Sequence, residues 1–135
     1  MAVTANSIIT PQTPKANTAE VTTGNTNYDT PASLGTLITA GANGARVTRI
    51  TAIPRESVAD TQLQLYRDGN GSGTNKRFFE SAKMATYTLT SATEVPTTDL
   101  GYSDANPLIL APGEVVYCGT ALSKKITFNA EWADY

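Results

Sequence analysis

The sequence of 135 residues contains no histidine and a single cysteine, Cys118. Without histidine, the chain cannot build the Ser-His-Asp or Cys-His systems of hydrolases, or a metal site ligated by imidazole. A lone cysteine cannot close a disulfide within the chain or assemble a multi-cysteine zinc site. Together with the acidic pairs and the glycine-rich loop considered below, these absences lead us to expect no enzymatic activity, no metal and no cofactor. We expect Cys118 to be a small buried apolar residue.

Charged residues and long apolar runs are also scarce. Only 16% of the residues are charged, and the 10 basic and 12 acidic side chains leave a net charge of −2. This balance lacks the basic surface that binding to nucleic acid requires. No apolar run is longer than the four residues 108–111, so we expect neither a membrane span nor a secretory hydrophobic segment. The predicted partners therefore include no nucleic acid and no membrane, and we expect the protein to be made and kept in a cytoplasm.

Threonine supplies much of the polar surface instead. The chain has 22 threonines, and threonine is a β-branched residue that favours strands. Asparagine, glycine and proline, which favour turns, are spread among the apolar residues. This composition argues against a helical bundle and favours a series of short strands.

Short strands separated by turns are predicted from residue 34 to the C-terminus. In the last and clearest of them, Phe128 and Trp132 point to one face and polar residues to the other, so Trp132 is expected in the core. Between residues 45 and 53, Val47, Ile50 and Ile53 are spaced by three, which fits a strand with a bulge. No stretch has the period of an amphipathic helix. The predicted strands are residues 34–39, 45–53, 62–67, 76–80, 85–92, 108–110, 115–120 and 125–132.

Two turn signals support this assignment. Asn43-Gly44 between apolar segments is a strong signal for a hairpin, and Pro112-Gly113 fits the central positions of a type II turn. Strands and turns at this regular spacing predict an all-β fold. We expect an antiparallel β-sandwich that is jelly-roll-like, formed by residues 34–135.

Residues 1–33 differ from the rest of the chain. Their apolar residues follow neither a helical nor an alternating period, so the segment cannot bury a face of its own. We predict an extended N-terminal arm over 1–33, with one short strand around 16–22, and a domain over 34–135 that folds without it. A disordered terminus is the alternative. The arm residues predicted to bind a partner are Ile8, Ile9, Val21 and Tyr28.

The glycine-rich loop that begins at Asp68 has two functional interpretations. Asp68, Asn70 and Ser72 match the first, third and fifth positions of a calcium loop, but Phe79 stands where the twelfth position needs an acid. A phosphate-binding loop would need a lysine and a helix after the glycines, and neither follows. Because a hairpin loop accounts for the same residues, we predict no metal site here.

Two further residue sets are candidates for action on a saccharide. Glycoside hydrolysis needs two carboxyls in a cleft, one with a raised pKa, whereas the acidic neighbours of this chain are expected to be solvated. These pairs are Glu56/Asp60, Asp99/Asp104 and Glu131/Asp134. Exposed tyrosine or tryptophan rings stack well on sugars. The candidates for such a platform are Tyr66, Tyr87, Tyr102 and Trp132.

Four short segments carry a resemblance to a known group of proteins. They are LQLYRDG at 63–69, RFFE at 77–80, PLILAPGE at 107–114 and AEWADY at 130–135. Together they resemble small β-rich virion proteins of tailed bacteriophages, of the head decoration or cement type. The resemblance covers about residue 45 to the C-terminus. It implies a structural role without catalysis at the capsid surface of the virion, after synthesis in the host cytoplasm. It also implies binding to major capsid protein subunits and self-association around local symmetry axes.

Two functions from different classes remain open. The first is a capsid decoration protein that binds the outer surface of the phage head and stabilises it. The second is a small receptor- or carbohydrate-binding module of a phage tail or fibre. The arm favours the first, because a cement protein must bridge neighbouring subunits and an arm that folds on contact does so. Since charge is sparse, we expect this binding to change little with salt.

Overall fold

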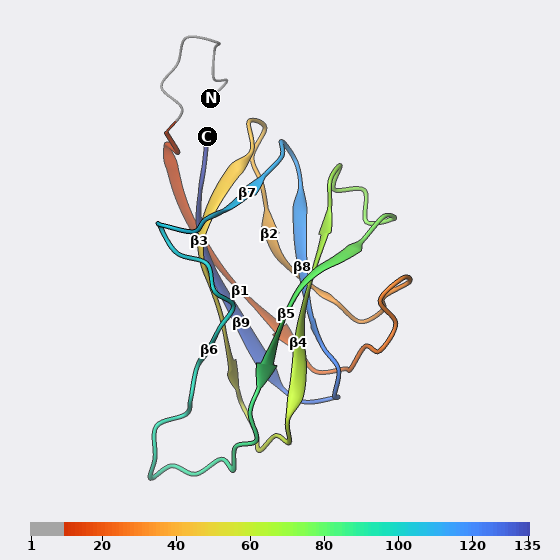
Figure 1. Ribbon diagram of the computed structural model, residues 1–135, viewed down its shortest axis with the longest axis vertical. Coiled ribbons are helices and arrows are strands. Elements are labelled where there is room, and N and C mark those ends of the chain that lie inside the picture. The colour runs from red at the N-terminus through yellow and green to blue at the C-terminus, as the bar shows by residue number, and fades with distance from the viewer. Residues whose placement is uncertain (1–9) are drawn as a thin grey trace.

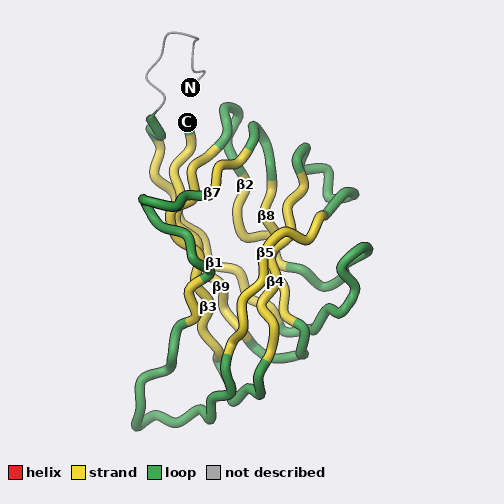
Figure 2. The backbone as a smooth tube through the Cα atoms, viewed as in Figure 1, coloured by secondary structure: helices red, strands yellow, loops and turns green. Residues whose placement is uncertain are grey.

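The computed structural model describes residues 10–135, which form two antiparallel β-sheets packed together, with no helix in this part of the chain (Figures 1 and 2). The prediction of an all-β sandwich is confirmed. Residues 10–135 accordingly contain no helix long and apolar enough to cross a membrane. The strands are β1 (Thr13–Val21), β2 (Gly35–Thr39), β3 (Ala45–Pro54), β4 (Thr61–Asp68), β5 (Arg77–Met84), β6 (Thr98–Asp99), β7 (Leu108–Leu110), β8 (Val115–Thr120) and β9 (Ile126–Asp134).

The strands pair as a nested series. β1 pairs with β9, β2 with β8, β3 with both β6 and β7, and β4 with β5, all in antiparallel orientation. Pairing of β3 with β9 and of β4 with β8 then joins these ribbons into sheets of order β1-β9-β3-β6 and β2-β8-β4-β5. As a result, β1 and β9 lie side by side although they stand at opposite ends of the sequence (Figure 1).

The core lies between the two sheets, where alternate residues of facing strands meet. In β9, Ile126 and Phe128 are fully buried and Trp132 is 8% exposed, so the predicted burial of Trp132 is confirmed. Leu63 and Leu65 of β4 contribute to the same cluster from the smaller sheet. Burial of such apolar side chains contributes about 1.5–3 kcal/mol each to folding. The faces of β9 and β4 therefore hold the sheets together.

β1 corrects the expected boundary at residue 33. Its nine residues pair with β9 along their whole length, from Thr13 opposite Asp134 to Val21 opposite Ile126. Val21 is 2% exposed and belongs to the core cluster. Residues 13–21 are therefore a strand of the sandwich and not an arm outside it. The short strand expected around 16–22 is this strand, but longer and integrated into the domain.

Two other local expectations were wrong. Asn43-Gly44 does form a turn, in which Gly44 has φ of 90°, but the flanking strands β2 and β3 belong to different sheets. The turn is therefore a crossing between sheets and not a hairpin. Residues 85–92, expected as a strand, lie in the long connection between β5 and β6. An isolated bridge between Val58 and Tyr87 fastens that connection to the domain.

Candidate functional site

The four residues predicted to bind a partner do not form one surface. Val21 is buried against β9, so its apolar side chain is covered by this chain's own core and not by a partner. Ile8 and Ile9 lie outside the described residues. Tyr28 is 44% exposed, on the loop between β1 and β2. Of the two that the structure describes, Tyr28 is the one that is exposed to contact with another molecule.

Tyr28 and Phe78 form an exposed pair of aromatic rings. Their ring centroids are 4.6 Å apart, and Phe78 at the start of β5 is 36% exposed. Phe78 also contacts the fully buried ring of Tyr66, with 5.3 Å between centroids. The Tyr28 hydroxyl donates a hydrogen bond of 2.7 Å to Gln62 on β4. Both exposed rings are therefore held in place by residues of β4.

The loop that carries Tyr28 is fixed by Asn25. This side chain is buried, and its amide donates to Gln64 at 3.0 Å and to the Tyr66 hydroxyl at 2.9 Å. Its carbonyl oxygen accepts hydrogen bonds from the backbone N–H groups of Asn27 and Ala32. Buried polar networks with every member paired rigidify their surroundings. The loop is thereby anchored to the outer face of the smaller sheet.

The opposite wall is the hairpin between β4 and β5, which is fixed by Asp68. The buried carboxylate of Asp68 accepts backbone hydrogen bonds from Asn70, Gly73 and Asn75 and one from the Ser72 hydroxyl. The residues that suggested a calcium loop are thus used within a turn. Burial opposes the charged form of Asp68, but the backbone N–H groups outweigh it and hold the pKa of this carboxyl below its usual value.

We expect Asp68→Asn to lower the melting temperature at pH 7 more than at pH 3. A carboxyl with a depressed pKa stabilises the fold fully above its unfolded pKa of about 3.9 and loses this contribution as the pH falls through the folded value. The measurement is the difference in melting temperature between parent and variant from pH 7 to pH 2. A difference that stays the same across this range would contradict a role for the charge.

Between the loop and the hairpin lies a hollow of about 430 Å³, which we call the Tyr28 pocket. A smaller hollow of about 210 Å³ adjoins it and shares Asp29, Thr74 and Lys76 as lining residues. The ammonium group of Lys76 lies 4.4 Å from the ring centroid of Tyr117. The residues that line the pocket are Tyr28, Asp29, Thr74, Asn75, Lys76, Arg77 and Phe78. The pocket thus combines two aromatic rings with hydrogen-bonding and charged groups.

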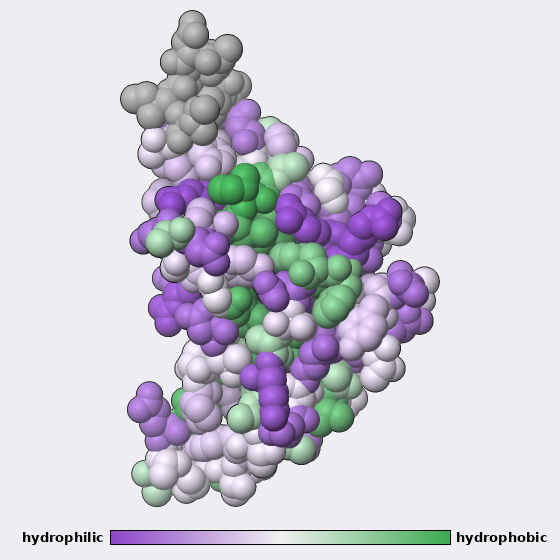
Figure 3. All heavy atoms as spheres, viewed as in Figure 1, coloured by the Kyte–Doolittle hydropathy of each residue, from purple (hydrophilic) through white to green (hydrophobic). Residues whose placement is uncertain are grey.

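A second exposed feature lies where β7 of the larger sheet approaches β4 and β5. Ile109 of β7 is 53% exposed, the largest exposed fraction among the big apolar residues described. Phe79 and Tyr102 are partly buried against the core, and Arg67 lies 5.3 Å from the Phe79 ring centroid. Figure 3 shows hydrophobic side chains over β7 and the adjoining part of β5 on the side facing the viewer. We call the four residues Arg67, Phe79, Tyr102 and Ile109 the Ile109 surface.

Arg67 fixes the geometry of this surface. Its guanidinium donates two hydrogen bonds of 2.6 Å to the carboxylate of Glu114 and one of 3.1 Å to the backbone oxygen of Ile109. The hydrogen bonds from Arg67 hold the pKa of Glu114 below its usual value, and Glu114 raises the pKa of Arg67. Burial, with Glu80 nearby, raises the pKa of Tyr102 to about 12. The surface is therefore rigid, and its one cation is already paired.

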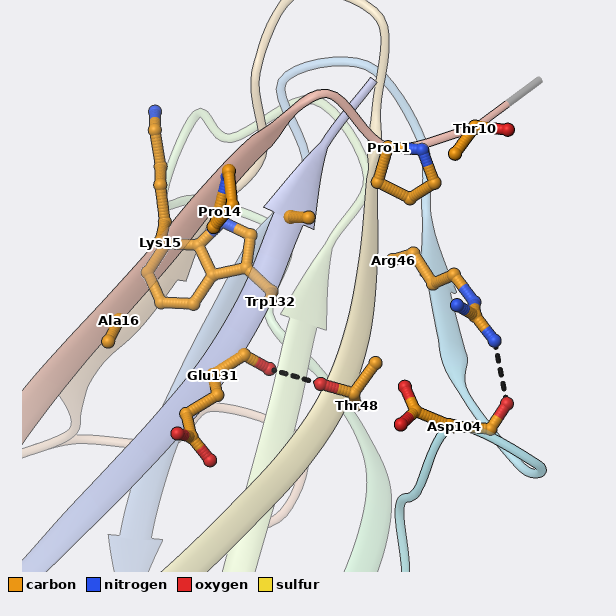
Figure 4. A pocket seen from close by; sticks show the side chains of 11 residues that line it. Thr10, Pro11, Pro14, Lys15, Ala16, Arg46, Thr48, Asp104, Glu131 and Trp132 are labelled. Atoms are coloured by element: carbon orange, nitrogen blue, oxygen red, sulfur yellow. Dashed lines mark hydrogen bonds between the residues drawn. The ribbon is translucent and has the colours of Figure 1, made fainter. Parts of the chain in front are cut away.

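A third hollow, of about 690 Å³, lies where the chain entering β1 passes the end of β9 and the start of β3 (Figure 4). Here Arg46 donates to the backbone oxygen of Asp104 at 2.6 Å, and Thr48 donates to that of Glu131 at 3.4 Å. Figure 4 shows the carboxylates of Asp104 and Glu131 on opposite sides of Thr48. The polar groups of this hollow connect strand and loop, and its acids do not converge on one point.

Two of the acidic pairs considered for glycoside hydrolysis lack the required arrangement. Glu131 is exposed and Asp134 is buried, on opposite faces of β9, and Asp134 lies 2.7 Å from the ammonium of Lys15. The hydrogen bond from Lys83 lowers the pKa of Asp60 to about 2. A general acid needs a raised pKa. Asp60 therefore lacks the environment of such a group, and Glu131 and Asp134 do not face one another across a cleft.

The aromatic residues considered as candidates for a sugar platform are largely covered, Trp132 as expected for a core residue. Tyr66 is fully buried and Trp132 is 8% exposed, while Tyr87 and Tyr102 are partly buried against the core. Phe78, which the sequence analysis did not single out, is the exposed partner of Tyr28. The sequence did offer a signal for this exposed ring. Phe78 and Phe79 are adjacent at the start of a strand, and because neighbouring strand residues point to opposite faces, one of the two rings must point away from the core.

The remaining sequence predictions concern metals and the cysteine. Residues 10–135 contain no group of three or more His, Cys, Asp or Glu side chains placed to hold a metal ion. Cys118 is buried as predicted, and burial raises the pKa of its thiol to about 12, so the thiol is neutral near pH 7 and unreactive. Compared with known proteins, the chain matches no family model and no curated protein.

Proposed function

We propose that this chain is a capsid decoration protein, which binds the outer surface of an assembled phage head through the Ile109 surface and stabilises the shell. The observation that carries the proposal is this apolar surface, in which Ile109 is 53% exposed beside two aromatic rings and a paired arginine. Aromatic residues and arginine are enriched at the centres of protein–protein interfaces, and unpaired charges are depleted there. The surface therefore suits a protein partner.

The order of the strands is consistent with this proposal. The nested pairs β1·β9, β2·β8, β3·β7 and β4·β5 are those of one long antiparallel ribbon rolled into two sheets. We infer that the sandwich is a jelly roll, a form with eight strand positions in which β6 and β7 share the place beside β3. Jelly rolls occur in viral capsid domains and in lectins. The fold is thus compatible with both functions that the sequence left open.

The partners of this proposal are major capsid protein subunits, with self-association around local symmetry axes of the shell. Arg67 is the only charged member of the Ile109 surface, and it is paired with Glu114 in the free protein. Binding through such a surface gains little from long-range attraction between charges. Occupancy of the shell should therefore change little between low and high salt.

We expect Ile109→Asp to lower binding to phage heads by about tenfold or more, since it places an unpaired charge at the centre of the interface. The matched control is Leu122→Asp, at another exposed aliphatic residue, which is 39% exposed on the turn between β8 and β9. Particles released from the source bacterium are purified on a density gradient, stripped of this chain and incubated with each variant. The bound amount is then measured relative to the shell protein.

Two results would overturn the proposal. One is that purified particles lack this chain or carry it at a few copies in the tail, which would move the binding module ahead. The other is that Ile109→Asp rebinds as well as Leu122→Asp while both melt like the parent. Binding by Leu122→Asp and loss of binding by Ile109→Asp is the supporting outcome.

The Tyr28 pocket favours a second candidate, the receptor- or carbohydrate-binding module. Exposed aromatic rings stack on sugars, and the pocket places Tyr28 and Phe78 beside polar side chains such as Asn75. This surface is formed by the 22–34 loop and the β4–β5 hairpin, whereas the Ile109 surface includes β7 and the Arg67 guanidinium. One protein can therefore use both.

A further inference from the structure

We propose that the Tyr28 pocket binds a sugar ring that carries a carboxylate, as a uronic acid does. The inference rests on the second candidate function for the binding of a saccharide, and it adds the charge of the ligand and the residues that recognise it. It does not depend on attachment to a phage head. Three features of the pocket carry it: its exposed rings, its rigid walls and two cations that take part in no described ion pair.

The exposed rings supply a stacking surface. Tyr28 and Phe78 are 44% and 36% exposed, and their rings are tilted by 40° to one another. A pyranose ring presents C–H groups on one face, and these pack against the face of an aromatic ring. Exposed aromatic area of this kind is costly in water, and contact with a ligand removes the cost. The tilted pair of rings forms a shallow surface on which one sugar residue can stack.

The walls of the pocket are fixed before a ligand arrives. Asn25 anchors the loop on one side, and Asp68 anchors the hairpin on the other. The side-chain carbonyl of Asn27 fixes the loop further, because it accepts hydrogen bonds of 3.0 Å from the backbone N–H groups of Asp29 and Thr30. A preorganised site pays less conformational entropy when it binds. A small ligand with few contacts can therefore bind here.

The charged groups of the pocket favour an acid. Lys76 and Arg77 both line it, and neither takes part in an ion pair with another described residue. The Lys76 ammonium contacts the ring of Tyr117, a neutral partner that leaves its charge uncompensated. Asp29 is the single acidic lining residue, so the pocket carries an excess of positive charge. Charge-assisted hydrogen bonds to a carboxylate are stronger than neutral ones. We assign the carboxylate of the ligand to Lys76 and Arg77.

The remaining lining groups suit the hydroxyls of the same ligand. Asp29 accepts hydrogen bonds, Asn75 both donates and accepts through its amide, and Thr74 does so through its hydroxyl. The volume of 430 Å³ lies at the lower end of the usual range for small-molecule sites, which is about 300–1,000 Å³. The adjoining hollow of 210 Å³ extends the groove toward Pro31. The site is therefore large enough for one sugar residue with room for a second.

The test compares ligands that differ only in the carboxylate. Methyl glucuronide and methyl galacturonide are titrated into the full-length protein, alongside methyl glucoside and methyl galactoside, and binding is followed by amide chemical shifts. We expect at least one uronide to bind about tenfold more tightly than its neutral counterpart, with shift changes in residues 28–31 and 73–78. Sodium acetate, which offers the carboxylate without the ring, should cause no comparable change.

Variants then separate the two parts of the site. Tyr28→Ala should weaken binding of the uronide by about tenfold, whereas Tyr28→Phe, which keeps the ring but loses the hydroxyl hydrogen bond to Gln62, should weaken it less. Lys76→Gln combined with Arg77→Gln should remove the preference for the uronide, and Lys124→Gln, away from the pocket, should preserve it. All variants replace exposed or partly exposed side chains, and unchanged melting temperatures verify that they fold.

The outcomes distinguish the two levels of the proposal. Equal binding of uronides and neutral glycosides, lost in Tyr28→Ala, would overturn the acidic ligand and leave the carbohydrate-binding function standing. No binding of any glycoside would overturn both. Binding of acetate as tight as that of the uronide would show an anion site without sugar recognition, and would overturn the proposal as well.

Discussion

Deleting residues 1–22 is expected to leave a chain that no longer unfolds cooperatively. The deletion removes β1, which pairs with β9 over nine residues, and with it Val21 from the core. It also removes Lys15, whose ammonium lies 2.7 Å from the carboxylate of Asp134, a residue only 5% exposed. The Asp134 carboxylate keeps its hydrogen bond from the backbone N–H of Gly41, and the Lys15 side chain is 46% exposed, so the ion pair itself contributes only about 0–1 kcal/mol. The main loss is the nine-residue pairing with β9 and the burial of Ala19 and Val21, which is large against the whole stability of an ordinary domain, about 5–15 kcal/mol.

The measurement is thermal unfolding of residues 23–135 against the full chain, followed by circular dichroism in the near and far ultraviolet. A pair of point variants tests the same claim in a chain that keeps β1. Val21→Asp places a charge in the core and should cost about 3 kcal/mol or more, whereas Thr22→Asp, at the exposed next residue, should cost little. A cooperative transition of residues 23–135 within a few degrees of the parent would restore the idea of a separate arm.

Strands whose two faces differ in polarity could be predicted from the sequence. β9 alternates apolar and polar residues from Ile126 to Trp132, and the structure buries the apolar set as expected. The spacing of Val47, Ile50 and Ile53 predicted a bulge in β3, and the pairing of β3 with β9 shifts register between Val47 and Arg49. A buried face leaves a period in the sequence, and a bulge leaves a break in that period.

β1 was not placed correctly because its sequence carries little of that period. Six of its nine positions are exposed in succession, and only Ala19 and Val21 face the core. β1 is held in the sheet mainly by backbone hydrogen bonds to β9, and these bonds do not depend on the type of residue. The same limit explains Asn43-Gly44. A turn signal is local, whereas the partners of β2 and β3 are β8 and β9, far away in the sequence.

Of the aromatic rings at the candidate site, the sequence pointed to Tyr28 but not to Phe78. Tyr28 stood out as an apolar residue without a period, and the structure leaves it exposed. Tyr66 points to the outer face of β4, as alternation predicts, but the loop anchored by Asn25 covers it. Phe78, at the start of β5, packs against Tyr66 and is the ring that stays exposed. Which of several outward rings remains exposed depends on loop packing, and no strand period encodes loop packing.

Replacing Trp132 by alanine is expected to cost about 3–5 kcal/mol, the usual range for emptying the site of a buried large aromatic residue. For a domain of this size the loss lowers the melting temperature by roughly 10–20 °C. Trp132 lies near the end of β9, opposite Lys15 of β1 and Val47 of β3, and it belongs to the core cluster at 8% exposed.

Trp132→Phe separates the ring from its polar atom. The indole Nε1–H of Trp132 is buried and has no hydrogen-bond acceptor among the described residues, and such an unpaired donor costs about 1–3 kcal/mol. Phenylalanine removes this donor while it keeps most of the apolar contact, so Trp132→Phe should cost less than half as much as Trp132→Ala. The measurement is the free energy of unfolding in urea for the three proteins. A Trp132→Ala variant that melts within a degree or two of the parent would contradict the burial of this ring and return it to the candidates for a sugar platform.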